Sequence, residues 1–404
     1  MRLKFFYSRS DIRELIPSDR KGVFVTLFFA MFATITGVGI VVPLLPVYAH
    51  DIGATGIYVG MIFGSFSISR TVLLPLFGRL SDRRGRKPFI VLGLLAYTLI
   101  SFAFVLSKNV ESLIILRFIQ GGASAMVMPV VQAYVGEITR EGSEGYSMSF
   151  FNLSMFLSLT IGPLMGGTIK DILSMDAGFI AMGALSGLGL LLSIFLLPPV
   201  QEETAGTGKR DTVPWSHILK DQALIGIFVF RYVYTSCVGI IWCFLPLYGD
   251  SIFGLSGSMI GILVTLGVFI AGLLQIPMGR MADKVDKNRM IIIGGLFAAI
   301  GVIIPYFADS FSDLLIGVCV FGLGGGIASP AIMALAVLKG EEKKAMGTVM
   351  SIITLAHSLG MFTGSMAAGV FMDLFSLKAV FPCGAFFMLA GILVFVLMKR
   401  QCTT

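Results

Sequence analysis

Twelve long apolar stretches dominate this chain of 404 residues. A lipid bilayer has a hydrocarbon core about 30 Å thick, which an α-helix of about 20 apolar residues can cross. Each of the twelve stretches reaches this length. The sequence therefore predicts an all-α membrane protein whose transmembrane helices lie at 23–48, 57–78, 88–107, 111–136, 146–170, 176–198, 223–249, 257–280, 289–308, 312–337, 345–371 and 377–398.

The composition agrees with a chain that is surrounded by lipid. Only 13% of the residues are charged, whereas a soluble domain contains about 25%. The sequence has no nucleotide-binding loop and no soluble catalytic domain, and its five cysteines do not have the spacing of metal ligands. We therefore expect neither an enzyme nor a metal centre.

The basic residues are concentrated in alternate loops. If the N-terminus is cytoplasmic, the cytoplasmic segments contain 24 Lys and Arg residues and the external loops contain 3. This bias follows the positive-inside rule and predicts a multi-pass protein of the cell (inner) membrane with both termini in the cytoplasm. It also accounts for the net charge of +7 through contact with anionic lipid, so no nucleic-acid partner is expected.

One long polar loop divides the chain into two halves. We expect a cytoplasmic segment at 1–22, a six-helix bundle at 23–198, a cytoplasmic linker at 199–222, a second six-helix bundle at 223–398 and a cytoplasmic tail at 399–404. The two halves resemble each other at a nearly constant offset, which indicates an internal repeat. The matched positions include Gly78 with Gly279, Asp82 with Asp283, Pro129 with Pro330, Gly162 with Gly364, Gly167 with Gly369, and Asp171 with Asp373.

Three short runs in the first half carry a family resemblance. Residues 78–87 read GRLSDRRGRK, residues 117–122 read RFIQGG and residues 162–167 read GPLMGG. These runs resemble signature motifs of the major facilitator superfamily, and the third is similar to the antiporter motif of its drug:proton antiporter branch. The resemblance implies two pseudo-symmetric six-helix bundles, a substrate site between them, a proton gradient in place of a cofactor, and function as a monomer.

The first run is expected to act as a conformational latch. Asp82 can accept charge-assisted hydrogen bonds from Arg86 or from a helix N-terminus, most plausibly that of the helix at 345–371. A plainer interpretation is that the basic residues only fix the topology. The residues assigned to the latch are Gly78, Asp82, Arg83, Gly85 and Arg86.

The charged residues inside the spans are three arginines, and no acidic residue lies near the middle of a span. Because a charge within the bilayer is costly, such residues usually face a polar cavity. Arg117 resembles a family coupling residue, although it could instead bind backbone carbonyls. His357 could exchange the driving proton or remain a neutral hydrogen-bonded group. Coupling or gating is assigned to Arg117, Gln120, Gly162, Pro163, Gly166, Gly167 and His357.

A substrate cavity lined by cationic and neutral groups favours anionic, zwitterionic or neutral amphipathic compounds over lipophilic cations. This expectation assumes that neither Glu137 nor Asp51 reaches the cavity. The proposed lining residues are Arg70, Arg231, Asn152, Tyr232, Tyr234, Trp242 and Gln275.

Two functions follow from the sequence. The first is a secondary active transporter that exports a small amphipathic compound, a drug or a metabolite, in exchange for protons. The alternative is an importer or facilitator of a small metabolite, possibly an anion, on the same fold. The antiporter-like run favours the first, but the fold alone does not decide between them.

Overall fold

The computed structural model describes residues 20–139, 144–198, 221–343 and 346–401, together with Pro17. Most of the predicted N-terminal segment, linker and C-terminal tail lie outside these residues. Within the described residues there are twelve membrane-length helices and no strand, so the predicted all-α fold is confirmed. Eleven of these helices are long and apolar enough to cross a membrane. The twelfth, α7, is 29 residues long and packs between α2 and α11.

The first half forms one bundle. Proline interrupts its first span, which the sequence predicted as a single helix, because Pro43 and Pro46 lack the N–H groups that the helical ladder needs. The helices over 56–84, 110–138 and 144–172 extend beyond the predicted spans at both ends, whereas those over 86–106 and 175–196 begin one or two residues earlier than predicted and also end one or two residues earlier. Their bounds are α2 Lys21–Val41, α3 Leu45–Asp51, α4 Gly56–Arg84, α5 Arg86–Leu106, α6 Val110–Ile138, α7 Glu144–Ile172 and α8 Met175–Leu196.

The second half repeats this arrangement. Short 3₁₀ turns, η1 and η2, precede and follow the pair α13 and α14. The bounds are α10 Gln222–Phe253, α11 Gly257–Lys284, α12 Lys287–Ile303, η1 Ile304–Phe307, α13 Phe311–Glu342, α14 Met346–Leu374, η2 Leu377–Ala379 and α15 Val380–Gln401.

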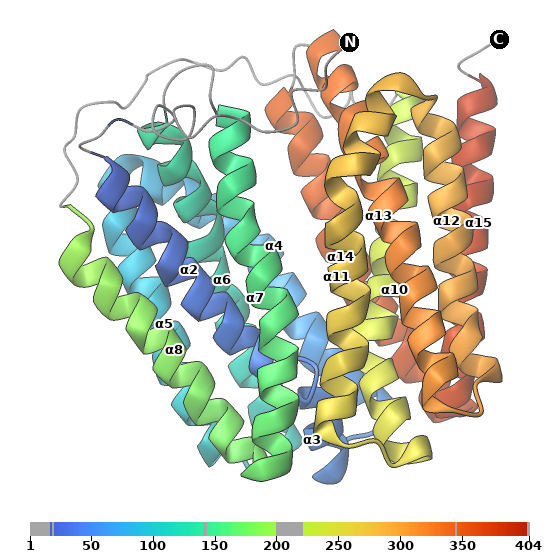
Figure 1. The fold of residues 1–404 in the computed structure, drawn as a ribbon, viewed down its shortest axis with the longest axis horizontal. Helices are drawn as coiled ribbons and strands as arrows, with labels where there is room; N and C mark the ends of the chain where they lie inside the picture. Colours follow the sequence, from blue (N-terminus) through green and yellow to red (C-terminus); the bar gives the residue numbers. More distant parts are fainter. Residues whose placement is uncertain (1–16, 18–19, 140–143, 199–220, 344–345, 402–404) are drawn as a thin grey trace, which may run out of the picture.

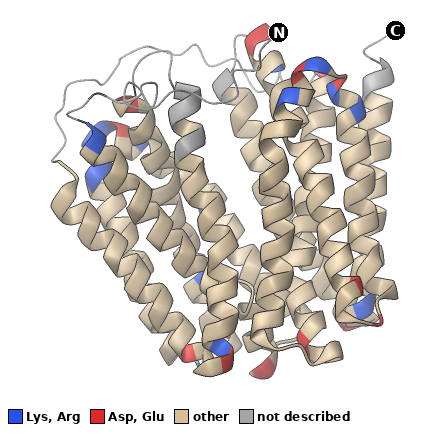
Figure 2. Ribbon diagram, viewed as in Figure 1, with Lys and Arg blue, Asp and Glu red and all other residues tan. Residues whose placement is uncertain are grey.

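The two bundles stand side by side, and their helices run between two faces of the molecule (Figure 1). We call the face where α2 begins and α15 ends the terminal face, and the other the opposite face. The charged residues gather at these two faces, as Figure 2 shows. Two helix pairs make the main contact between the bundles, α4 with α14 and α7 with α11. These pairs are equivalent under the sequence repeat.

Candidate functional site

At the opposite face, a carboxylate of each half caps a helix of the other half. Asp171, near the end of α7, accepts hydrogen bonds from the backbone N–H groups of Gly257 (2.7 Å) and Ser258 (2.8 Å) at the start of α11. Asp373, near the end of α14, accepts them from Gly56 (2.6 Å) and Ile57 (2.9 Å) at the start of α4.

These two carboxylates have a clear electrostatic role. The first N–H groups of a helix have no partner within it, and the helix dipole places partial positive charge there. Asp171 and Asp373 supply both the missing acceptors and a negative charge. Since they are equivalent positions of the repeat, they form a symmetric pair of clasps between the halves. The sequence matched the two positions but gave no sign of the helix termini they would meet.

Glycines allow the backbones to approach behind each clasp. A Cβ on Gly167 would lie 2.1 Å from the carbonyl oxygen of Gly257, and a Cβ on Gly369 would lie 2.3 Å from that of Gly56. Deeper in the α7–α11 contact, a Cβ on Gly261 would lie 2.4 Å from the carbonyl oxygen of Pro163. No other residue type fits such contacts, so the glycines permit the close approach of α7 to α11 and of α4 to α14. We call these two contacts between the halves the seam.

The antiporter-like run divides its contacts between two neighbours. Gly162 and Gly166 pack against α2 of their own half, where added Cβ atoms would lie 2.8 Å from the Cα of Gly39 and 2.1 Å from the carbonyl oxygen of Ile40. The carbonyl group of Pro163 and the Cα of Gly167 instead face α11 of the other half, while the ring of Pro163 lies against Gly39 of α2. One short segment therefore fastens α7 within its bundle and also forms the interface.

The seam reaches only part of the way across the molecule. From Asp171 to Phe156, which lies against Gly272 of α11, it runs about 22 Å along α7, which is about 43 Å long at 1.5 Å per residue. Beyond it the bundles diverge toward the terminal face (Figure 1). The closed face is therefore the opposite face.

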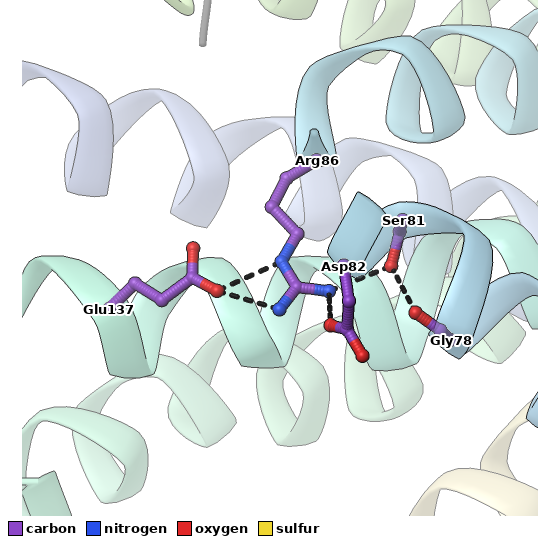
Figure 3. A network of polar contacts seen from close by, with 5 residues as sticks. All are labelled: Gly78, Ser81, Asp82, Arg86 and Glu137. Atoms are coloured by element: carbon purple, nitrogen blue, oxygen red, sulfur yellow. Dashed lines mark hydrogen bonds and ion pairs between the residues drawn. The ribbon is translucent and has the colours of Figure 1, made fainter. Parts of the chain in front are cut away.

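The signature loop forms a polar network at the terminal face (Figure 3). Arg86 donates to Glu137 of α6 through Nη2 (2.6 Å) and Nε (3.0 Å), and pairs with Asp82 (2.5 Å) and Ser81 (2.7 Å) through Nη1. Gly85 links α4 to α5 with a φ of +87°, a backbone conformation that favours glycine. The network thus ties together three helices of one half.

Of the two partners expected for Asp82, the structure pairs it with Arg86. Among the described residues, Asp82 forms no hydrogen bond or ion pair with α14. The contacts between α4 and α14 seen at Gly56, Gly60 and Gly64 lie toward the opposite face. Gly78 contributes a carbonyl oxygen that accepts from Ser81 (2.8 Å), and Arg83 is exposed. Any latch between the halves is therefore disengaged here.

Arg117 is buried inside the first bundle. Its Nε donates to the carbonyl oxygen of Ile62 (3.2 Å) and its Nη1 donates to Gln120 (2.8 Å). The guanidinium also lies over the rings of Phe63 and Phe66, at 5.2 and 4.5 Å from their centres. In this conformation Arg117 therefore has the backbone-bound arrangement that the sequence left as an alternative.

Three other cationic or titratable candidates lie on helices that pack together. Arg231 of α10 lies 3.4 Å through Nη2 from Nδ1 of His357 on α14, and Arg70 lies on α4, which packs against α14. The Nε groups of both arginines are buried without a hydrogen-bond partner. Arginine can only donate, so Nδ1 of His357 accepts, and the proton of the neutral ring is on Nε2.

An apolar cavity of about 200 Å³ lies along α10. It is formed between the halves by residues of α7, α10, α11 and α13, and Phe156 and Leu159 contribute the wall from the first half. Tyr234 and Trp242 line it, and Tyr234 stacks on Phe321 at 5.7 Å between ring centres. Three other candidates do not line it: Asn152, Gln275, and Tyr232, which stacks on Phe228.

The acidic residues that could have entered the centre lie elsewhere. Glu137 is bound to Arg86 near the terminal face, and Asp51 ends α3 at the opposite face. None of the carboxylates that the structure describes lies in the middle of a helix. The charge of the central site is therefore positive in this conformation.

The sequence profile of the Major Facilitator Superfamily matches residues 27–256 and 233–401, which together include both bundles. The chain belongs to this superfamily. It is thus a transporter and a multi-pass membrane protein, not an enzyme.

Several members of the major facilitator superfamily are similar to it along nearly their whole length. The chain is 29% identical to an uncharacterised transporter of Methanocaldococcus jannaschii, with 94% of this chain and 99% of the relative covered. It is 25% identical to Multidrug resistance protein 2 of Bacillus subtilis (95% and 97% covered) and 28% identical to Quinolone resistance protein NorA of Staphylococcus aureus (94% and 97% covered).

Solved structures of the major facilitator superfamily share the fold. The nucleoside transporter NupG superposes with a TM-score of 0.77 at 13% identity, covering 94% of this chain and 99% of its own. A bacterial homologue of the lysosomal transporter Spinster gives a TM-score of 0.76 at 12% identity, covering 94% and 97%.

Proposed function

We propose that this chain is a secondary active transporter of the cell membrane that works by alternating access as a monomer, and that it exports small amphipathic compounds in exchange for protons. The observation that carries this proposal is the symmetric seam, α4 with α14 and α7 with α11, which among the described residues is closed by hydrogen bonds at the opposite face. With the termini in the cytoplasm, as the basic residues favour, this conformation accepts substrate from the cytoplasm.

Two further observations support export over import. The Gly162-Pro163 run resembles the antiporter motif and forms the seam with α11. Two similar proteins are named for resistance to drugs, a property that export would provide.

Import or facilitation of a small anionic metabolite is the second candidate, and the buried Nε groups of Arg70 and Arg231, which have no hydrogen-bond partner, favour it. The two candidate functions differ in whether substrate and proton move in the same direction or in opposite directions. An anion bound near a titratable group favours its protonation, so that anion and proton travel together, whereas a cation competes with the proton and is exchanged for it.

Proton flux in proteoliposomes tests the proposed function. With a pH-sensitive dye inside the vesicles, we expect at least one of a quinolone, an aromatic carboxylate and a quaternary ammonium compound to move protons opposite to its own movement. Protein-free liposomes are the control. Transport with protons moving in the same direction as the compound would favour the second candidate, and compound movement without proton movement would contradict both couplings.

Asp82→Asn should lower transport several-fold without preventing membrane insertion. In this conformation Asp82 is 60% exposed, so its pair with Arg86 contributes at most about 1 kcal/mol, and thermal stability should hardly change. The loss is expected because Asp82 acts as the latch in the other conformation. Transport rate and melting temperature are compared with Asp283→Asn, the same change in the second half. Unchanged transport in Asp82→Asn would rule out the latch.

A further inference from the structure

We infer that Arg70, Arg231 and His357 form an anion-binding site, which takes the charged head of an amphipathic anionic substrate whose apolar body enters the adjacent cavity. The inference rests on the alternating-access transport proposed above, but not on its direction. By the linkage given there, an anion bound beside His357 would move together with the proton, as in the second candidate.

Helix register brings Arg70 to the level of His357. Helices α4 and α14 are antiparallel, and a Cβ on Gly64 would lie 2.8 Å from the ring of Phe362. Arg70 follows Gly64 along α4 by six residues and His357 precedes Phe362 along α14 by five, so they lie about 9 Å and about 8 Å closer to the terminal face. A site between these residues therefore includes groups from both halves.

The inward direction of Arg70 follows from helix periodicity. Met61, Ile68 and Val72 are 37%, 39% and 68% exposed and mark the outer side of α4. At 100° per residue, Arg70 projects nearly opposite to these three positions, toward the centre of the molecule. The arginine is thus not at the lipid surface, where its charge could reach the headgroups.

The two arginines have donors without acceptors. The Nε groups of Arg70 and Arg231 are buried and make no hydrogen bond, and the contact that Arg231 does make is to a neutral imidazole. Arg117 of the same protein shows the contrast, since both its Nε and its Nη1 have oxygen acceptors. A buried charge without a counter-charge is costly, so the site is suited to an acceptor that arrives with the substrate.

The apolar cavity continues from the cationic group along α10. Arg231, Val238 and Trp242 are spaced by seven and four residues and so lie on one face of this helix. Val238 and Trp242 line the cavity, which places its apolar wall about 10 Å from Arg231 toward the opposite face. A charged head on the arginines and an aromatic body against Trp242 and Phe156 match this layout.

Three matched probes test the site on the purified full chain. 2-Naphthoate, 2-naphthamide and 2-naphthylmethylammonium share one ring system and differ in charge. We expect naphthoate to bind about tenfold or more tightly than the other two, because it alone provides a charged acceptor. Equal or tighter binding of the ammonium probe would overturn the inference.

Substitutions locate the binding. Arg70→Gln and Arg231→Gln should each weaken naphthoate binding about tenfold or more, Arg231→Lys should weaken it less, and Arg289→Gln is the control because Arg289 is 79% exposed. Melting temperature without ligand reports whether each variant folds, and the lysine variants Arg70→Lys and Arg231→Lys replace any glutamine variant that does not. Unchanged naphthoate affinity in the folded variants would place the anion elsewhere and contradict the site.

Transport by the same preparations separates this inference from the proposed function. If naphthoate binds at the arginines but is transported neither in exchange for protons nor together with them, the anion site is supported and the transport proposal is contradicted. If other compounds move with coupled protons but naphthoate does not bind, the transport proposal is supported and the anion site is contradicted.

Discussion

Replacing Asp171 and Asp373 together by asparagine is expected to open the opposite face of the transporter. Each carboxylate accepts at least two backbone hydrogen bonds from a helix terminus of the other half. Asparagine keeps one acceptor oxygen and loses the charge, at a cost of about 1 kcal/mol per site. Because both clasps break in the same transition, the population of the closed face relative to the open one should fall about thirtyfold.

Hydrogen exchange measures this opening at the amides involved. The N–H groups of Gly56, Ile57, Gly257 and Ser258 should lose protection in the double variant. Asp313→Asn is a matched control, because Asp313 accepts backbone hydrogen bonds only from its own half, from Asp309 (3.1 Å) and Ser310 (2.9 Å). It should expose the start of α13 and leave α4 and α11 protected. Full protection of α4 and α11 in the double variant would show that the seam closes without the clasps.

Alanine at the adjacent glycines 166 and 167 should produce two different defects. In Gly167→Ala the new Cβ would meet Gly257 of the other half, 2.1 Å from its carbonyl oxygen, whereas in Gly166→Ala it would meet Ile40 of the same half at the same distance. Overpacking of this kind costs about 1–3 kcal/mol. The first cost arises only when the opposite face closes, but the second is present in every conformation.

Transport per folded molecule therefore separates the two variants. Gly167→Ala should lower it about tenfold or more, since the closed state is destabilised relative to the open one. Gly166→Ala should lower yield and melting temperature and leave transport per folded molecule nearly unchanged. Gly22→Ala is the control, because a Cβ there meets nothing within 4 Å. Equal transport by Gly167→Ala and the control would contradict a functional role for the close seam.

The sequence by itself determined the elements and the family. Span length and hydropathy are local properties, so twelve spans could be counted, and the signature runs and the repeat could be read without any contact. The break in the first span shows the limit of this reasoning, since Pro43 ended a helix there while Pro163 lies within α7 without ending it.

Only the tertiary structure decided how the candidate residues act. Asp373 and Gly56 are 317 positions apart, and they meet because two separately folded bundles pack through α4 and α14. The same packing paired Asp82 with Arg86 of its own half, brought Arg231 within 3.4 Å of His357 and set Arg70 at the level of His357. Hydropathy determines which residues enter the membrane. Which of these residues contact each other depends on the relative tilt of the two halves. That tilt depends on backbone contacts between distant helices, which no local sequence pattern encodes.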